Sequence, residues 1–112
     1  MTERCRVVWT EVAARDYESI LAYVAVHSGV RVAARLDARL QRRIAALDTT
    51  PARCRIVPEL RAEGLDIYRE LIVHPYRIMF RLRGKDVVLL AVVDGRRDLQ
   101  ELLIERALLG AL

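Results

Sequence analysis

The stretch spanning residues 67–98 most constrains how this chain can fold. It reads IYRELIVHPYRIMFRLRGKDVVLLAVVDGRRD, three apolar segments separated by His74-Pro75 and by Gly84-Lys85. Proline and glycine interrupt strands, whereas β-branched and aromatic side chains favour a pleated, packed surface. The stretch therefore predicts a three-stranded antiparallel meander with two tight turns.

Alternation of side chains divides the predicted meander into two faces. If both turns are two-residue loops, Val73 faces Tyr76 and Arg83 faces Asp86. The first face then forms a core in which Arg69 is the lone charge, and its apolar members are Ile67, Leu71, Val73, Tyr76, Ile78, Phe80, Leu82, Val87, Leu89, Ala91 and Val93. The opposite side of the sheet, here called the second face, is predicted to carry Tyr68, Glu70, Ile72, Arg77, Met79, Arg81, Val88, Leu90 and Val92.

This second face combines an apolar floor with arginines, one carboxylate and a tyrosine. An exposed apolar patch of that size usually marks a contact with a partner. The sequence leaves two alternatives for what covers the second face: a partner protein or the chain's own C-terminal helix.

Length and composition indicate one folded domain. A chain of 112 residues can build an ordinary core, and 54% apolar with 30% charged residues is typical of folded proteins. No apolar run approaches the roughly 18 residues of a membrane span, and the first residues lack a signal-peptide layout. We therefore expect a cytoplasmic protein without a membrane partner.

The two cysteines, Cys5 and Cys54, lack the spacing of a metal or redox motif. No metal and no cofactor is expected, and both thiols are interpreted as small buried hydrophobes. The net charge is +4 and Lys85 is the only lysine. Arginines favour bidentate contacts with carboxylates or phosphates, which fits an acidic protein or a nucleic acid as partner. A biased genomic base composition would produce the same arginine excess.

The N-terminal half predicts a strand and a helical hairpin. A strand is expected over residues 4–9, followed by a helix from Thr10, its N-cap, to about His27. Gly29 ends that helix, and a second one follows over residues 30–47. The arginines on its outer side are interpreted as a solvated surface, with partner binding as the minority interpretation; they are Arg31, Arg35, Arg39, Arg42 and Arg43.

Residues 52–66 form a connection that fits either an extended piece at residues 55–57 or a helical turn at residues 59–62. After the meander, Asp98 can cap a last helix with Leu99, Leu102, Leu103 and Ala107 on one stripe. The predicted fold class is α+β: an N-terminal strand, an antiparallel helical hairpin, a three-stranded antiparallel meander and a C-terminal helix. One domain is expected over residues 1–112.

Nearly the full chain resembles the RelE/ParE superfamily of type II toxin–antitoxin toxins. The segments that carry the resemblance are VVWTEVAARDYESILAYV, LDTTPARCRIVPEL, IYRELIVHPYRIMFRL and VLLAVVDGRRDL. It implies a small basic toxin of a plasmid-stabilisation pair, neutralised by an antitoxin whose C-terminal segment wraps over the sheet and helices. RelE-type members cleave mRNA on the ribosome, whereas ParE-type members poison DNA gyrase.

Proton-transfer chemistry distinguishes these two branches. Cleavage of RNA through its 2′-hydroxyl needs groups that accept and donate protons, which arginine does not do near neutral pH. The one plausible catalytic cluster is Glu70 with Tyr68, Arg77 and Arg81, and a Glu–Arg cross-strand pair is the better interpretation of Glu70. In ParE-type sequences a histidine often precedes the GxRD segment, where this chain has Asp94. The sequence is closer to ParE than to RelE.

The antitoxin or the target is expected to contact the sheet. The predicted binding residues are Tyr68, Arg69, Ile72, Arg77, Met79, Arg81, Leu90, Arg96 and Arg97. Leucines or valines of the antitoxin are expected on Ile72, Met79 and Leu90, and its carboxylates against Arg77 and Arg81. Two alternatives to a gyrase toxin stay open: a ribosome-dependent mRNA endonuclease, and a protein that keeps the fold without harming the cell.

Overall fold

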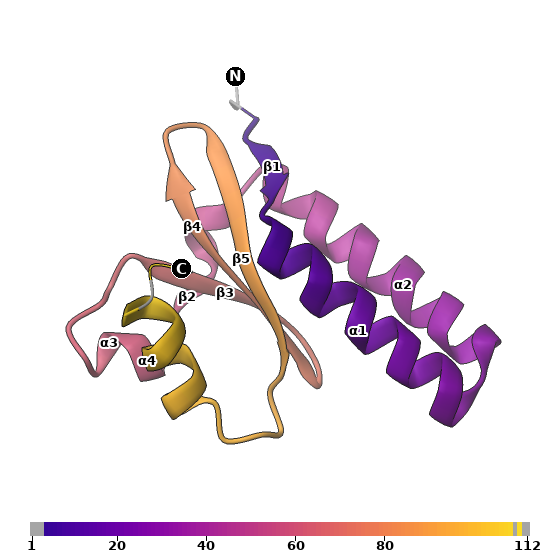
Figure 1. Ribbon diagram of the computed structural model, residues 1–112. Helices are drawn as coiled ribbons and strands as arrows, with labels where there is room; N and C mark the ends of the chain where they lie inside the picture. Colours follow the sequence, from indigo (N-terminus) through magenta and orange to yellow (C-terminus); the bar gives the residue numbers. More distant parts are fainter. Residues whose placement is uncertain (1–3, 109, 111–112) are drawn as a thin grey trace.

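The computed structural model describes residues 4–108 and 110, and its centre is a five-stranded sheet (Figure 1). The strand order is β1-β5-β4-β3-β2, in which β1 runs parallel to β5 and the other neighbours are antiparallel. The bounds are β1 Arg6–Trp9, β2 Arg55–Ile56, β3 Tyr68–Val73, β4 Tyr76–Arg83 and β5 Asp86–Asp94. The predicted meander is confirmed as β3-β4-β5, with Val73 opposite Tyr76 and Arg83 opposite Asp86.

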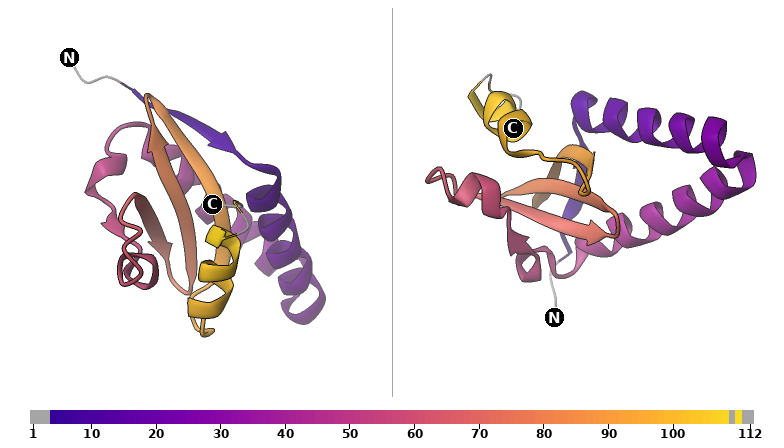
Figure 2. Two further views of the ribbon diagram at one scale, coloured as in Figure 1. Left: turned by 60° about the vertical axis from the view of Figure 1, so that its left-hand side comes forward. Right: turned by 90° about the horizontal axis from the view of Figure 1, so that it is seen from below.

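Helices lie on both sides of this sheet (Figure 2). Their bounds are α1 Glu11–Ser28, α2 Val30–Ala45, α3 Pro58–Arg61 and α4 Gln100–Leu108, with short 3-10 turns at Ala46–Asp48 and Pro51–Arg53. The Thr10 hydroxyl oxygen accepts the Ala13 N–H at 3.2 Å, so the predicted N-cap is present. Gly29, at φ 100°, joins α1 to α2 in the predicted hairpin. Among the described residues, no helix is long and apolar enough to cross a membrane.

The sheet separates two hydrophobic clusters. On the first face, the α1–α2 hairpin packs against β3, β4 and β5, and the cluster contains Ala13, Tyr17, Leu40, Ile44, Leu47, Leu71, Val73, Tyr76, Ile78, Phe80, Val87, Leu89 and Val92. On the second face, α3 and α4 cover the sheet, and the cluster contains Val57, Leu60, Tyr68, Met79, Leu90, Ala91, Val93, Leu99 and Leu103. The cover of the second face is thus the chain's own C-terminal helix.

A register shift in β5 corrects the predicted faces. Phe80 pairs with Leu89 but Met79 pairs with Ala91, so Leu90 is an extra residue in the ladder. Beyond a bulge the alternation of side chains changes sides. Ala91 and Val93, predicted for the first face, therefore lie on the second, and Val92 lies on the first.

Smaller corrections concern segment ends. The connection contains both alternatives, the strand β2 and the helical turn α3. The predicted core residues Ile67 and Leu82 are exposed, because Ile67 precedes β3 and Leu82 lies near the β4–β5 turn. Both cysteines are half-buried free thiols rather than fully buried.

Asp16 on α1 contacts both the edge of the sheet and the C-terminal helix. The β1 ladder ends at Trp9 opposite Leu89, which leaves the rest of β5 without a strand on that edge. There, Asp16 Oδ2 accepts the Val92 N–H at 3.0 Å. The same carboxylate accepts hydrogen bonds from both terminal nitrogens of Arg106, at 2.8 and 3.0 Å, so it also fixes the position of α4. The C-terminal helix is fixed by an ion pair as well as by apolar packing.

Truncation of Leu103 tests the packing of α4. Leu103 is fully buried, so we expect Leu103→Ala to lower the free energy of unfolding by about 2–5 kcal/mol in chemical denaturation. Leu82→Ala, which truncates an exposed leucine, is the matched control and should cost far less. Equal small losses in both variants would show that α4 does not seal the second face.

Candidate functional site

Arg77 is the centre of a buried ion-pair network on the second face. Its two terminal nitrogens donate to the two carboxylate oxygens of Glu59 at 2.6 Å each, and its Nε donates to Glu70 Oε1 at 2.6 Å. Arg55 Nε donates to the other oxygen of Glu70 at 2.5 Å. The Glu70 side chain is 0% exposed. Charges buried this deeply are tolerated because each one has an oppositely charged hydrogen-bond partner.

The strand register explains how these side chains meet. Ile72 lies opposite Arg77, so Glu70, two residues earlier on the same face, is the diagonal neighbour of Arg77. Arg55 lies directly opposite Glu70 on β2, and α3 brings Glu59 over the guanidinium. The interpretation of Glu70 as a member of a Glu–Arg cross-strand pair is confirmed.

Gly95 leaves the space through which the Arg77 side chain passes. A Cβ atom at position 95 would lie 2.8 Å from Arg77 Cδ and 2.9 Å from the Pro75 carbonyl oxygen. Contacts this short do not occur without movement of the neighbours. The Gly95 N–H also donates to the Pro75 carbonyl at 2.7 Å. Glycine is therefore required here for close approach, and the GRRD segment, residues 95–98, starts with it for a steric reason.

The network shifts the pKa values of Glu59 and Arg77 towards their charged forms. Hydrogen bonds from the Arg77 guanidinium lower the pKa of Glu59, and the Glu59 and Glu70 carboxylates raise the pKa of Arg77. Both oxygens of Glu70 already accept hydrogen bonds, and its side chain has no contact with solvent. A base that abstracts a proton from a substrate must reach that proton. In this conformation Glu70 stabilises the fold.

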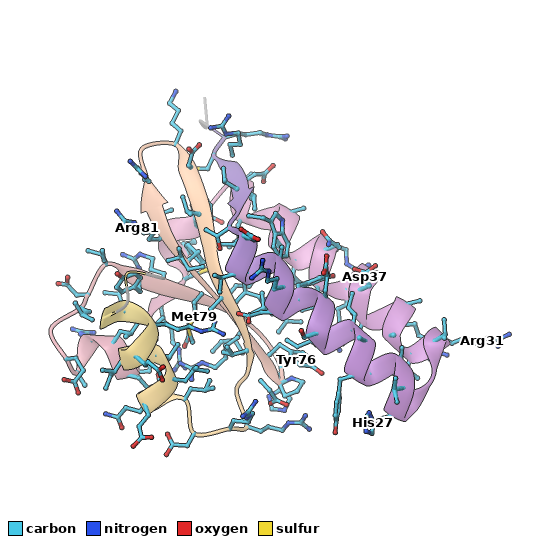
Figure 3. All side chains as sticks on the ribbon, in the orientation of Figure 1. His27, Arg31, Asp37, Tyr76, Met79 and Arg81 are labelled. Atoms are coloured by element: carbon cyan, nitrogen blue, oxygen red, sulfur yellow. The ribbon has the colours of Figure 1, made fainter. Side chains whose placement is uncertain are left out.

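The predicted binding residues divide by exposure. Tyr68, Arg77, Met79 and Leu90 are buried, and α3 and α4 occupy the space over them. In Figure 3, Met79 lies beside α4, and it packs in one cluster with Leu103 of that helix. The structure therefore leaves no room for antitoxin leucines on Met79 and Leu90 while α4 is in place. Arg77 is paired with Glu59 and Glu70, although it also lines a hollow of about 210 Å³ with Arg55, Ile72 and Arg96. An amphipathic pattern shows that a face is covered but does not identify the cover.

The remaining predicted residues are accessible to different degrees. Arg69 lies on the first face and donates to the Cys54 carbonyl at 2.7 Å, so it is not a neighbour of Arg77. Arg81 is half-buried. Ile72, Arg96 and Arg97 are exposed at or near the end of the sheet that holds the β3–β4 turn. Arg96 donates to Asp94 at 2.7 and 3.0 Å, which lowers the pKa of Asp94.

A cleft that the sequence did not reveal separates this end of the sheet from the helical hairpin. Its volume is about 460 Å³, and its lining residues are Tyr23, Val24, Ser28, Val32, Arg35, Leu36, Arg39, Pro75, Tyr76 and Arg96. A second hollow of about 410 Å³ adjoins it and shares Tyr23, Tyr76 and Arg96, adding Ser19, Ile20, Asp94 and Arg97. We call the two together the hairpin cleft. Of the predicted binding residues, it contains Arg96 and Arg97.

Two signals for this cleft are present in the sequence. Arg35 and Arg39 belong to the arginines assigned above to the outer side of the second helix. Tyr23, Val26, Val30 and Val32 are large apolar residues that the structure leaves exposed near the hairpin tip. Neither signal places these residues beside Tyr76, because that contact depends on how the hairpin packs on the sheet.

Comparison with known proteins identifies relatives along almost the whole chain. Residues 7–99 match the family model described as ParE toxin of type II toxin–antitoxin system, parDE. Toxin ParE3 of Caulobacter vibrioides is 33% identical over 94 residues, which cover 84% of this chain and 90% of that toxin.

Two solved structures share the fold. The chromosomal ParDE toxin–antitoxin system from P. aeruginosa has a chain that superposes with a TM-score of 0.68 at 20% identity, over 81% of this chain and 96% of that one. A chain of the toxin–antitoxin complex RelBE2 from Mycobacterium tuberculosis gives a TM-score of 0.58 at 20% identity, over 84% of this chain and 94% of that one. At this identity the likeness concerns the fold alone.

Removing the buried carboxylate tests the network. Glu70→Gln leaves Arg55 and Arg77 without their shared anion, so we expect the free energy of unfolding to fall by about 3 kcal/mol in chemical denaturation. Asp94→Asn is the matched control, because it removes a carboxylate from the exposed pair with Arg96 and should cost several-fold less. A Glu70→Gln protein as stable as the control would contradict a structural role for the network.

The lowered pKa of Glu59 gives a pH dependence. A carboxylate with a lower pKa in the folded state stabilises the fold above its unfolded pKa, about 4.3, and this stabilisation is lost as the pH falls through the folded pKa. We expect the gap in unfolding free energy between the native chain and Glu59→Gln to be constant above about pH 5 and to shrink below about pH 4. A gap that widens on acidification would contradict this assignment.

Proposed function

Because this chain belongs to the ParE toxin family of type II toxin–antitoxin systems, we propose that it is a toxin that poisons DNA gyrase and is neutralised by a cognate antitoxin. The family model covers residues 7–99. These residues include the helical hairpin, the GRRD segment and every strand residue except Arg6. The proposed target would place the chain in the cytoplasm.

The burial of Glu70 and its pairing with two arginines are the observation that favours a gyrase poison over an mRNA endonuclease. The nuclease hypothesis assigned proton transfer to Glu70 or Tyr68. Both side chains are buried on the second face, and Glu70 is held by Arg55 and Arg77. The exposed arginines at the end of the sheet can bind phosphate or carboxylate, but they do not exchange protons near neutral pH. A toxin that acts by binding needs no such group.

The relatives support an antitoxin as partner. The two structures with the same fold are described as a toxin–antitoxin system and as a toxin–antitoxin complex. A chain with a net charge of +4 is complementary to an acidic partner.

Expression in a bacterial host tests the proposal. Induction of this chain alone should arrest growth, induce the DNA damage response and leave bulk translation running at first. Purified chain should also inhibit supercoiling by gyrase. Co-expression with the reading frame beside its gene should restore growth.

Three results would contradict the proposal in different ways. Immediate loss of translation without a damage response would favour the mRNA endonuclease. Arrest with unaffected gyrase would remove gyrase as the target. Normal growth at full expression of folded protein would leave a fold that no longer harms the cell.

A further inference from the structure

The outer side of the second helix, α2, is strongly basic. Its sequence contains five arginines and a single carboxylate, Asp37, so the helix alone has an excess of four positive charges, as large as that of the whole chain. Asp37 lies on the side towards α1, where it accepts a hydrogen bond from the Tyr17 hydroxyl. All five arginines are exposed, and we call them the α2 arginine surface: Arg31, Arg35, Arg39, Arg42 and Arg43.

Four of these arginines follow one row along the helix. Arg31, Arg35, Arg39 and Arg43 are each separated by four residues, so neighbours lie about 6 Å apart along the axis and the outer two about 18 Å apart. Arg42 lies beside this row. In Figure 3, Arg31 points away from the molecule near the hairpin tip. The view from below in Figure 2 shows the hairpin reaching beyond the sheet, so the row is open to a large partner.

Carboxylates do not balance the α2 arginine surface. Like charges four residues apart destabilise a helix, and a solvated helix surface usually alternates the two signs. In the part of the chain that the structure describes, none of the five arginines forms an ion pair. Exposed arginines elsewhere do so, as Arg6 does with Asp86. The mutual repulsion within the row would be relieved when an anion binds.

Two of the arginines are held in place by the sheet. Arg39 donates to the His74 carbonyl oxygen at 3.0 Å, and Arg43 donates to the Ile72 carbonyl oxygen at 3.4 Å. A guanidinium has five N–H donors, so one such bond leaves donors for an anion. Side chains that are already ordered lose less conformational entropy on binding. This end of the row is therefore prepared for a ligand.

A regular polyanion fits the row better than an acidic protein or a lipid surface. A nucleic-acid duplex presents a phosphate about every 3.4 Å of its axis on each strand, whereas carboxylates on a protein follow no fixed interval. A helix that binds membranes needs bulky apolar groups beside its cations. Beyond Val32, the exposed uncharged residues of α2 are small or polar, namely Ala34, Ala38, Gln41 and Ala45.

We propose that the α2 arginine surface binds the phosphate backbone of duplex DNA, with α2 lying along the major groove. The major groove of B-DNA is about 12 Å wide and admits an α-helix, whereas that of duplex RNA is too narrow. Ala34 and Ala38 allow close approach, and the arginines reach the phosphates. Single strands fit less well, because α2 has no aromatic side chain on which bases could stack. The inference goes beyond the proposed function, since it requires neither gyrase nor an antitoxin.

Removal of three arginines tests the proposal. The probe is a fluorescein-labelled DNA duplex of mixed sequence and about 20 base pairs, longer than the row on α2. Binding of the purified chain is measured by fluorescence anisotropy at several salt concentrations. The variant combines Arg31→Gln, Arg42→Gln and Arg43→Gln, because none of these residues lines the hairpin cleft. We expect binding to weaken about tenfold or more, and the slope of log affinity against log salt to become shallower by about 3, one for each phosphate contact.

A matched control makes the same change in net charge outside α2. It combines Arg15→Gln, Arg61→Gln and Arg83→Gln, all at exposed positions. This control should bind the duplex within a few-fold of the native chain and keep the salt slope within about 1 of the native value. Circular dichroism and thermal melting confirm that both triple variants fold.

The outcomes separate this inference from the proposed function. Equal losses in both triple variants would show that overall charge alone attracts DNA, and would overturn a role for the α2 arginine surface. Duplex RNA or poly-glutamate bound as tightly as the DNA would overturn the choice of partner. Inhibition of gyrase by a chain that does not bind DNA would keep the proposed function and overturn this inference. DNA binding that depends on the α2 arginine surface, without any effect on gyrase, would do the reverse.

Discussion

The ion-pair network around Arg77 is the interaction on which the second half of the fold depends. It joins β2, β3, β4 and α3 through two glutamates, and the Gly95 backbone gives its side chain room to pass. A buried charge without a partner costs several kcal/mol, so the buried members, Glu70 and Arg77, depend on their partners. α4 then packs beside this network through Leu99 and Leu103 and is fixed to α1 by Arg106. The second face is closed by charge and by apolar burial together.

Closure of the second face determines where a partner can bind. The arginine that seemed best placed for an external carboxylate is occupied by internal ones, and the apolar floor around it lies under the chain's own helix. A larger exposed surface that combines apolar groups with basic charge lies between the hairpin and the β3–β4 turn. The proposed toxin would then offer a partner an open surface without any rearrangement of its core.

Much of the fold follows from local signals in the sequence. Pro75 and Gly84 mark the two turns, and two-residue loops give the register of β3–β4 throughout and of β4–β5 as far as Phe80 opposite Leu89. Thr10 and Gly29 mark the ends of α1 by their side-chain chemistry and backbone freedom. The bulge at Leu90 could not be foreseen, because an extra residue in an all-apolar strand leaves no mark in the pattern. The hairpin cleft could not be foreseen either, since α2 and the β3–β4 turn meet through packing between distant segments.

A double-mutant cycle between Glu59 and Arg77 tests the central claim most directly. The free energies of unfolding of the native chain, Glu59→Gln, Arg77→Gln and the double variant are measured under one set of conditions. If the network is structural, the losses in the free energy of unfolding should not be additive, and the coupling energy between the two sites should be about 1–3 kcal/mol. Additive, small losses would show that Arg77 is not committed to the interior, and the second face would again be the surface to examine for a partner.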